Sequence, residues 1–357
     1  ACGHGVLFVR ALIFGLVGIV ALLLLPDLGP GPLNAADPVV RATVIAVRGE
    51  QVEVQLIEGP RAGERLILPA GDEADTMVAL PEAGEEYLVY LPQPGDATPA
   101  ALAERYRFVP MLVAAAVVAF AAVAIGGAAG IRSLVALLFS GLLILRVTIP
   151  LLLTGAPALP VAMGSAIAVA ATTILIARGP GRSAAAAISG MTIALLIAAA
   201  ASEGAAALAG LSDIRGAADL YPLIGVLPGI DIAGLSMAAV LITATALIDD
   251  VAVTQVAAVE QLRLADRRMN DATVTAQAMA VGRAHAGALL NTIVIVWIGG
   301  SLPLVAALTM AGERADIILS AEVVAAELLR IAAGVIGTVA AIPATTYAAV
   351  RLGVGRR

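Results

Sequence analysis

Two adjacent carboxylates, Asp249 and Asp250, are the only charged side chains in the apolar run 237–259. Ionisable groups inside a bilayer are costly and commonly mark ion or proton pathways. Close carboxylates also tend to share a proton or a cation. The run therefore predicts a buried cation or proton site, which Thr254 and Gln255 would also line.

The two carboxylates should face different partners, because neighbouring residues on a helix point about 100° apart. Asp250 shares a face with Thr254, four residues on, and Asp249 does not. Two alternatives stay open. A helix that ends at Ile248 would put both aspartates at the cytoplasmic rim of the membrane, and a salt bridge would make them a structural lock between two spans.

A second polar cluster opens a later apolar run. At spacing i, i+4 and i+8, Arg283, Gly287 and Asn291 fall on one line of a helix, with His285 and Thr292 on a neighbouring line. We expect this stripe to face the two aspartates, with the glycine allowing close approach of another helix. One His and two Asp suffice only for a weak metal-site hypothesis, and the metal is unknown. The alternative for His285 is a packing hydrogen bond between helices.

Three further charges suggest structural pairing. Arg146 lies well inside an apolar run, and Glu327 is its natural partner because an unpaired intramembrane charge is costly. Arg330 lies near that glutamate. The apolar segment 221–234 is broken by Pro and Gly, and transporters place substrate sites at such breaks. The alternative is a loop that lies on the membrane.

The elements that would position these residues are membrane-spanning helices. Sixty per cent of the 357 residues are hydrophobic and 13% are charged, against about 25% charged in soluble domains. Charge-poor runs reach the length of about 20 residues that a spanning helix needs. The expected fold is a membrane all-α bundle of about eight spans, at 6–25, 108–130, 133–153, 157–177, 183–201, 235–259, 286–309 and 320–350.

A small polar domain interrupts the helices after the first span. Alternating runs at 39–47 and 52–56, with further runs at 65–68 and 87–91, indicate strands separated by turn residues. Four or five short strands suit a small β-barrel-like, OB-like domain. The expected organisation is an anchor at 1–25, a linker at 26–38, the β domain at 39–96, seven helices within 108–350 and a basic tail at 351–357.

Arginine placement predicts the orientation. With the N-terminus in the cytoplasm, Arg132, the 178–182 turn, the 263–268 cluster and the basic tail all fall inside, as the positive-inside rule requires. The C-terminus is then cytoplasmic too, and the β domain is extracytoplasmic. The expected location is the bacterial cytoplasmic (inner) membrane.

Several protein classes are disfavoured. The chain has no lysine, so a Walker-type Gly-Lys motif cannot occur, and neither His-Glu-x-x-His nor Gly-x-Ser-x-Gly is present. We therefore expect no enzyme. A net charge of −6 gives no sign of a nucleic-acid surface, and a single cysteine rules out an intrachain disulfide. The sequence does not identify a cofactor, which stays unknown.

Three runs resemble signatures of the YibE/F-like family of bacterial membrane proteins. These are ALIDDVAVTQ at 246–255, VGRAHAGALLNT at 281–292 and AIPATT at 341–346. The resemblance extends over essentially the whole chain, including EGPRAG at 58–63. It implies an inner-membrane location but no substrate. Ala284 stands where an acidic or polar residue is expected, which argues against a metal site there.

The leading hypothesis is a transporter or channel for a small ion or solute. Asp249 and Asp250 would bind the cation or proton, and Arg283 would set the charge balance. The alternative is a non-transporting membrane scaffold whose β domain binds an envelope protein. The expected partners are the lipid bilayer, a small ion or solute, and an envelope protein or a second copy of the chain.

Overall fold

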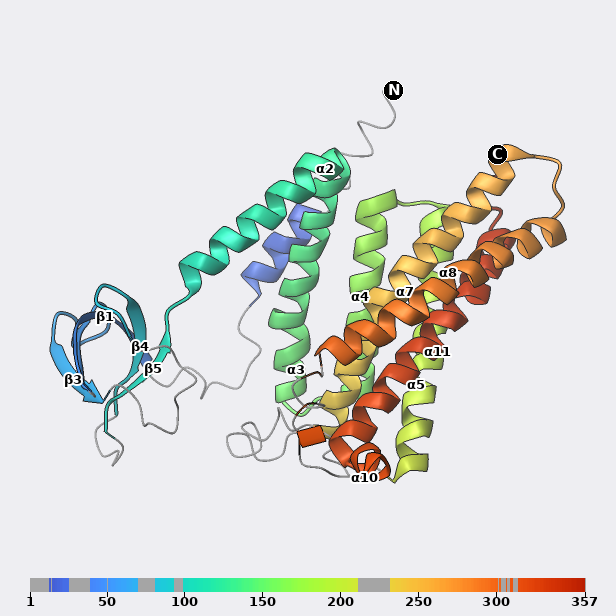
Figure 1. Cartoon of the computed structure of the whole chain (residues 1–357). Coiled ribbons are helices and arrows are strands. Elements are labelled where there is room, and N and C mark those ends of the chain that lie inside the picture. Colours follow the sequence, from blue (N-terminus) through green and yellow to red (C-terminus); the bar gives the residue numbers. More distant parts are fainter. Residues whose placement is uncertain are drawn as a thin grey trace. The chain divides into compact units, whose positions relative to one another are not determined.

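A computed structural model of the chain describes residues 13, 15–25, 39–49, 51–69, 81–92, 99–210, 232–300, 302, 306, 309–310 and 314–356. The chain divides into two compact units, residues 31–121 and residues 1–30 together with 122–357. Figure 1 shows a small curled sheet in the first unit and long helices in the second. The predicted linker at 26–38 and most of the broken segment 221–234 lie outside the described residues.

The sheet has five antiparallel strands in the order β3-β2-β1-β4-β5. They are β1 (Val39–Arg48), β2 (Gln51–Leu56), β3 (Arg65–Pro69), β4 (Glu86–Tyr90) and β5 (Ala101–Arg105). The sequence predicted the first four. It missed β5 because Ala, Leu, Glu and Arg favour helix, and the pairing of Leu102 with Val89 overrides that preference.

The core of the sheet comes from alternate positions of its strands, since successive side chains point to opposite faces. In β1 the buried positions are Val40, Ala42 and Val44, so Arg41 lies on the other face. The rest of the core is apolar apart from one tyrosine hydroxyl: Val52, Val54, Leu56, Leu68, Tyr87 and Val89.

An ion pair ties the outer face of β1 to the turn after β2. The Arg41 Nη2 lies 2.8 Å from the Glu58 Oε2, and the Arg41 backbone N–H donates to the Glu58 Oε1 at 3.1 Å. The guanidinium also lies 5.0 Å from the ring centre of Tyr106. The hydrogen bond from the Arg41 side chain lowers the pKa of the Glu58 carboxyl below its ordinary value.

Acid should weaken this sheet through Glu58. Because its pKa is lowered by folding, its stabilising contribution is present above the ordinary carboxyl pKa and disappears as the pH falls through the lowered one. We expect hydrogen exchange of the 39–69 backbone, corrected for intrinsic rates, to accelerate over that acidic window in wild type. Glu58→Gln should reduce this change, and Glu82→Gln should not. Identical profiles for wild type and Glu58→Gln would contradict the prediction.

The helices are α2 (Phe108–Leu143), a π-helical turn η3 (Ile144–Thr148), α3 (Ile149–Leu153), α4 (Ala158–Arg178), α5 (Arg182–Ala209), α7 (Ile232–Ala265), α8 (Asp271–Gly300), α10 (Ala315–Ser320) and α11 (Glu322–Arg351). Within the described residues, six helical stretches are long and apolar enough to cross a membrane, and Gly15–Leu24 is a shorter apolar helix. The chain is therefore a mostly helical protein with several long apolar helices.

Two local features interrupt the first long stretch, Phe108–Leu153. Gly127 leaves helical geometry with φ 54° and ψ −129°, near the break predicted between the second and third spans. Further on, Pro150 has no N–H and its ring crowds the carbonyl four residues earlier, that of Arg146. The helix accommodates this by widening into η3.

Small residues let the bundle helices approach closely. α11 packs against α5, α7 and α8, and α4 packs against α7, as Figure 1 shows for the green, yellow and red helices. At the α5–α11 crossing a Cβ on Gly190 would lie 2.6 Å from the Thr345 Cα. On the same pair of helices, a Cβ on Gly337 would lie 2.7 Å from the Ala198 Cβ. Such close packing is typical of helices associating in membranes.

Helices α7 and α8 extend beyond the apolar spans predicted within them. The helix α8 (Asp271–Gly300) begins fifteen residues before the predicted seventh span, 286–309. It begins there because the Asn270 Oδ1 accepts a hydrogen bond from the Thr273 N–H at 2.8 Å, which caps the helix. Residues 260–265, which follow the predicted sixth span, are also helical, because α7 continues to Ala265 and leaves only a short loop at 266–270.

Candidate functional site

The aspartate pair lies within α7. This helix runs unbroken from Ile232 to Ala265, so Asp249 and Asp250 are not at a helix end. The alternative of a helix ending at Ile248 is therefore excluded. Neighbouring helices α4 and α8 pack against α7 and supply the groups that surround the two carboxylates.

Asp249 faces α4. Its Oδ2 lies 3.4 Å from the Thr173 Oγ1, whose hydroxyl also donates to the Ala170 carbonyl at 2.9 Å. Its Oδ1 is buried and has no hydrogen-bond partner among the described residues. A buried polar atom without a partner is costly and calls for an explanation. The unsatisfied oxygen is the main chemical feature of the site.

Arg178 is the arginine of α4, and its guanidinium contacts groups other than the two aspartates. Its Nη2 donates to the Val253 carbonyl at 2.7 Å, and its Nη1 lies 3.7 Å from the Glu260 Oε2. Among the described residues no arginine forms an ion pair with Asp249 or Asp250. The geometry therefore does not match an arginine-capped lock.

Asp250 faces α8. Its Oδ2 lies 3.6 Å from the His285 Nε2, with side chains 63% and 31% exposed respectively. The two adjacent aspartates thus contact different helices, as the 100° step between helical neighbours requires. His285 and Asp250 form a second, more open contact next to the half-buried Asp249, and the His285 Nε2 has no hydrogen-bond partner among the described residues.

The remaining α8 candidates lie apart from the aspartates. Arg283, Gly287 and Asn291 are exposed on the outer side of α8. Arg283 has neither an ion pair nor a hydrogen bond among the described residues. The α8 residue that contacts an aspartate is His285, on the neighbouring line of the helix. The predicted stripe of Arg283, Gly287 and Asn291 does not. Thr254 is half-buried on α7.

Gln255 is fully buried where three helices meet. With its amide oriented to satisfy both ends, its Nε2 donates to the Thr346 Oγ1 at 2.9 Å and to the Ala278 carbonyl at 3.1 Å, and its Oε1 accepts from the Gly282 N–H at 3.3 Å. The side chain therefore joins α7 to α8 and α11. It lies behind the aspartates as a packing element, and no contact between it and them is observed in the described structure.

Arg146 lies in η3 and Glu327 in α11. Their pairing stays a prediction, and the side chain of Arg330 lies outside the described structure. Among described residues no group of three or more His, Cys, Asp or Glu is placed to hold a metal ion. The contacts at Asp249 and Asp250 involve one or two such groups each.

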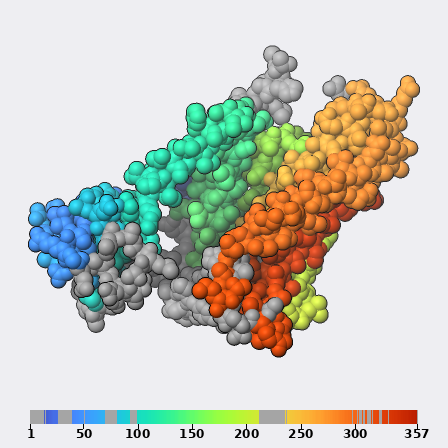
Figure 2. Space-filling view, viewed as in Figure 1, coloured from blue at the N-terminus to red at the C-terminus, as the bar shows by residue number. Residues whose placement is uncertain are grey.

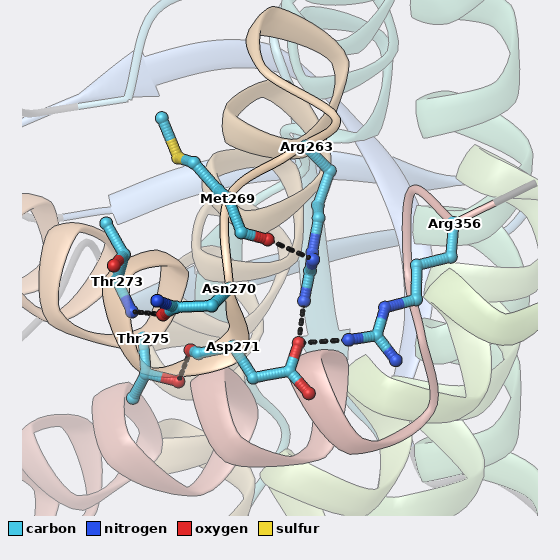
Figure 3. Close-up of polar contacts among 7 residues, drawn as sticks. All are labelled: Arg263, Met269, Asn270, Asp271, Thr273, Thr275 and Arg356. Atoms are coloured by element: carbon cyan, nitrogen blue, oxygen red, sulfur yellow. Dashed lines mark hydrogen bonds and ion pairs between the residues drawn. The ribbon is translucent and has the colours of Figure 1, made fainter.

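One end of the helical unit collects arginines, and we call it the basic end. Here the α4–α5 turn, the α7–α8 loop and the C-terminal tail meet. Figure 3 shows the buried Arg263 donating to the Met269 carbonyl at 2.9 Å, while Asp271 pairs with both Arg263 and Arg356. A Cβ on Gly353 of the tail would lie 3.7 Å from the Arg182 Nη1, at the start of α5. Segments far apart in sequence thus place their basic residues together.

The helical part of the chain matches a known protein family. A family model described as YibE/F-like protein matches residues 114–353. The chain belongs to the YibE/F-like family. The match covers the helices from α2 to α11 and leaves the sheet outside it. Comparisons with curated proteins and with solved structures give no match.

In this YibE/F-like chain the three runs that carried the resemblance meet around one side chain. Gln255 ends the first run, Gly282 lies in the second, and Thr346 ends the third. A Cβ on Gly282 would lie 2.6 Å from the Gln255 side-chain amide and would also overlap Ile342. These runs therefore build a shared helix junction, and the first of them also carries the aspartate pair.

Sequence reasoning missed Thr173 as a neighbour of Asp249, and it used Arg178 only for orientation. No spacing rule joins α4 to α7, because the residues in contact are 76 and 75 positions apart. The available signal was weak: Thr173 lies about one and a half turns before Arg178 on an apolar helix.

Proposed function

We propose that this YibE/F-like protein is a multi-pass membrane transporter or channel for a small cation or proton, with Asp249 as the central binding group. The observation that carries the proposal is the Asp249 carboxylate, half-buried in an apolar helix with one oxygen lacking any described partner. A carboxylate used for structure would have its lone pairs satisfied by an arginine or by several donors. A carboxylate that binds a cation needs a free oxygen when the site is empty.

The neighbouring groups suit this role. Thr173 offers a second oxygen 3.4 Å from Asp249, and oxygen ligands are what hard cations prefer. Asp250 and His285 are close enough for a proton to pass between them with a small adjustment. Their greater exposure makes them the entry to the site, and Asp249 its inner position.

The proposal includes a topology of about eight crossings, with the N-terminus and C-terminus in the cytoplasm of a bacterium and an OB-like β domain outside. Its support is the basic end: arginines from the α4–α5 turn, the α7–α8 loop and the tail gather on one side. The positive-inside rule assigns such a side to the cytoplasm. The outer domain would then gate the pathway or recruit an envelope partner.

Cation-dependent stability tests the proposal. A ligand that binds only the folded state at a hundredfold excess over its Kd stabilises it by about 2.7 kcal/mol. We expect one cation among Na⁺, K⁺, Mg²⁺, Ca²⁺ and Zn²⁺, or a change of pH, to raise the melting temperature of the purified wild type. Asp249→Asn should remove this response and Glu260→Gln should retain it. An equal response in wild type and Asp249→Asn would contradict the proposal and favour the scaffold.

A further inference from the structure

The outer side of α8 carries small residues, one asparagine and one arginine at the depth of the aspartate pair. Figure 2 shows this side, in orange, uncovered along most of the helix in the face turned to the viewer. Its exposed residues include Ala284, Gly287, Ala288 and Asn291, with Arg283 at the margin. About 18 Å of helix rise separates Arg283 from Asp271 at the basic end. An arginine that deep cannot face lipid without a large cost.

Arg283 and the nearest carboxylate, Asp250 of α7, lie on opposite sides of this surface. The bundle-facing side of α8 is marked by its buried residues Val274, Ala278, Gly282 and Ala286. His285 lies within that side, between Val274 and Ala278 around the helix, next to the exposed Asp250 of α7. Arg283 lies about 160° around the helix from His285, beyond Ala286 on the other side. The exposed surface is therefore bordered by a carboxylate on one edge and a guanidinium on the other.

The charges also lie at one depth. Asp250 is within 3.6 Å of His285, and Arg283 is two residues from His285, which is about 3 Å of rise. Copies of a membrane protein share one orientation, so a two-fold axis between them runs along the membrane normal. Rotation about that axis brings the Arg283 edge of one copy opposite the Asp250 edge of the other, twice.

We propose that the outer side of α8 is the interface of a homodimer in which Arg283 of each copy pairs with Asp250 of the other. The charge complementarity at matched depth selects a second copy of this chain as the occupant. Ala284, Gly287 and Ala288 at the centre allow the two α8 helices to approach closely, and Asn291 meets its counterpart across the axis. Arg283 of the second copy would then lie beside Asp250, at the entry of the proposed ion site. In this respect the inference rests on the proposed transport function.

Two differently tagged single variants, expressed together, test the pairing. Arg283→Asp alone places two carboxylates in each contact of its homodimer, and Asp250→Arg alone places two guanidiniums there. When the two variants meet, both contacts again join opposite charges. We expect co-purification of the mixed pair to exceed that of either variant with itself by about tenfold or more, since close interfacial charge pairs couple by at least that factor. Equal recovery in all combinations would overturn the pairing.

Cysteine cross-linking reads the interface without altering the charges. In a Cys2→Ser background, Ala284→Cys lies at the centre of the surface, and Ile193→Cys on α5, 47% exposed, serves as the matched control. Oxidation in native membranes should give a dimer band for the first and none for the second. No band at Ala284→Cys, with a well-folded protein, would overturn the dimer. This readout does not depend on flux, so failure of the dimer and failure of transport are distinguishable.

Discussion

Asp249→Asn is expected to abolish ion movement while leaving the protein at least as stable as wild type. The physical reason is that the buried Oδ1 has no partner among the described residues, so removing the charge relieves a cost instead of breaking a pair. Leaving a buried polar group unsatisfied costs about 1–3 kcal/mol. A variant that loses function without losing stability is typical of a group retained for activity.

Glu260→Gln is the matched control for this prediction. It removes a carboxylate from the same helix, and it weakens only the 3.7 Å contact with Arg178, which keeps its bond to the Val253 carbonyl. Unfolding of both variants can be followed in the same detergent by thermal denaturation. If Asp249→Asn melted well below wild type and Glu260→Gln did not, Asp249 would be a structural residue.

Gly190→Ala is expected to destabilise the bundle by about 1–3 kcal/mol, the usual cost of overpacking. The added Cβ would lie 2.6 Å from the Thr345 Cα, which is backbone and cannot rotate away. α5 and α11 would have to separate, and this is the most extensively packed helix pair in the described structure. Loss of the crossing would also disturb the neighbouring Gln255–Thr346 contact.

Gly204→Ala provides the comparison on the same helix. A Cβ there would meet nothing within 4 Å, so only helix propensity changes, and that favours alanine by up to about 1 kcal/mol. Equilibrium unfolding of the two variants should therefore shift in opposite directions. A Gly190→Ala protein as stable as Gly204→Ala would show that the α5–α11 crossing can relax without cost.

The helices and strands were largely predictable because their signals are local. Long apolar runs with few charges gave α4, α5, α7 and α11, and alternation gave the first four strands. The first half of α8 is more polar than a membrane span, since it carries Asp271, Gln277 and Arg283. Its start is set by the capping hydrogen bond of Asn270, which is a local signal too.

The candidate site was predictable only in part. The divergence of Asp249 and Asp250 follows from helix geometry alone. Which helix each one meets depends on packing between distant segments, so Thr173 was missed. Arg283, Gly287 and Asn291 do lie along one line of α8, but that line faces away from the aspartates. The side of α8 that packs into the bundle carries small residues such as Ala278 and Gly282, which give little hydrophobic signal in the sequence.

Ion flux through reconstituted vesicles would show whether Asp249 lies on a transport pathway. Wild-type and Asp249→Asn proteins would be compared for proton, monovalent and divalent cation movement with fluorescent reporters trapped inside. We expect flux of at least one of these ions in wild type and only background in the variant, with both proteins folded. No flux of any ion through wild type, together with a lower melting temperature for Asp249→Asn, would contradict it and make the aspartate a structural residue of a membrane scaffold.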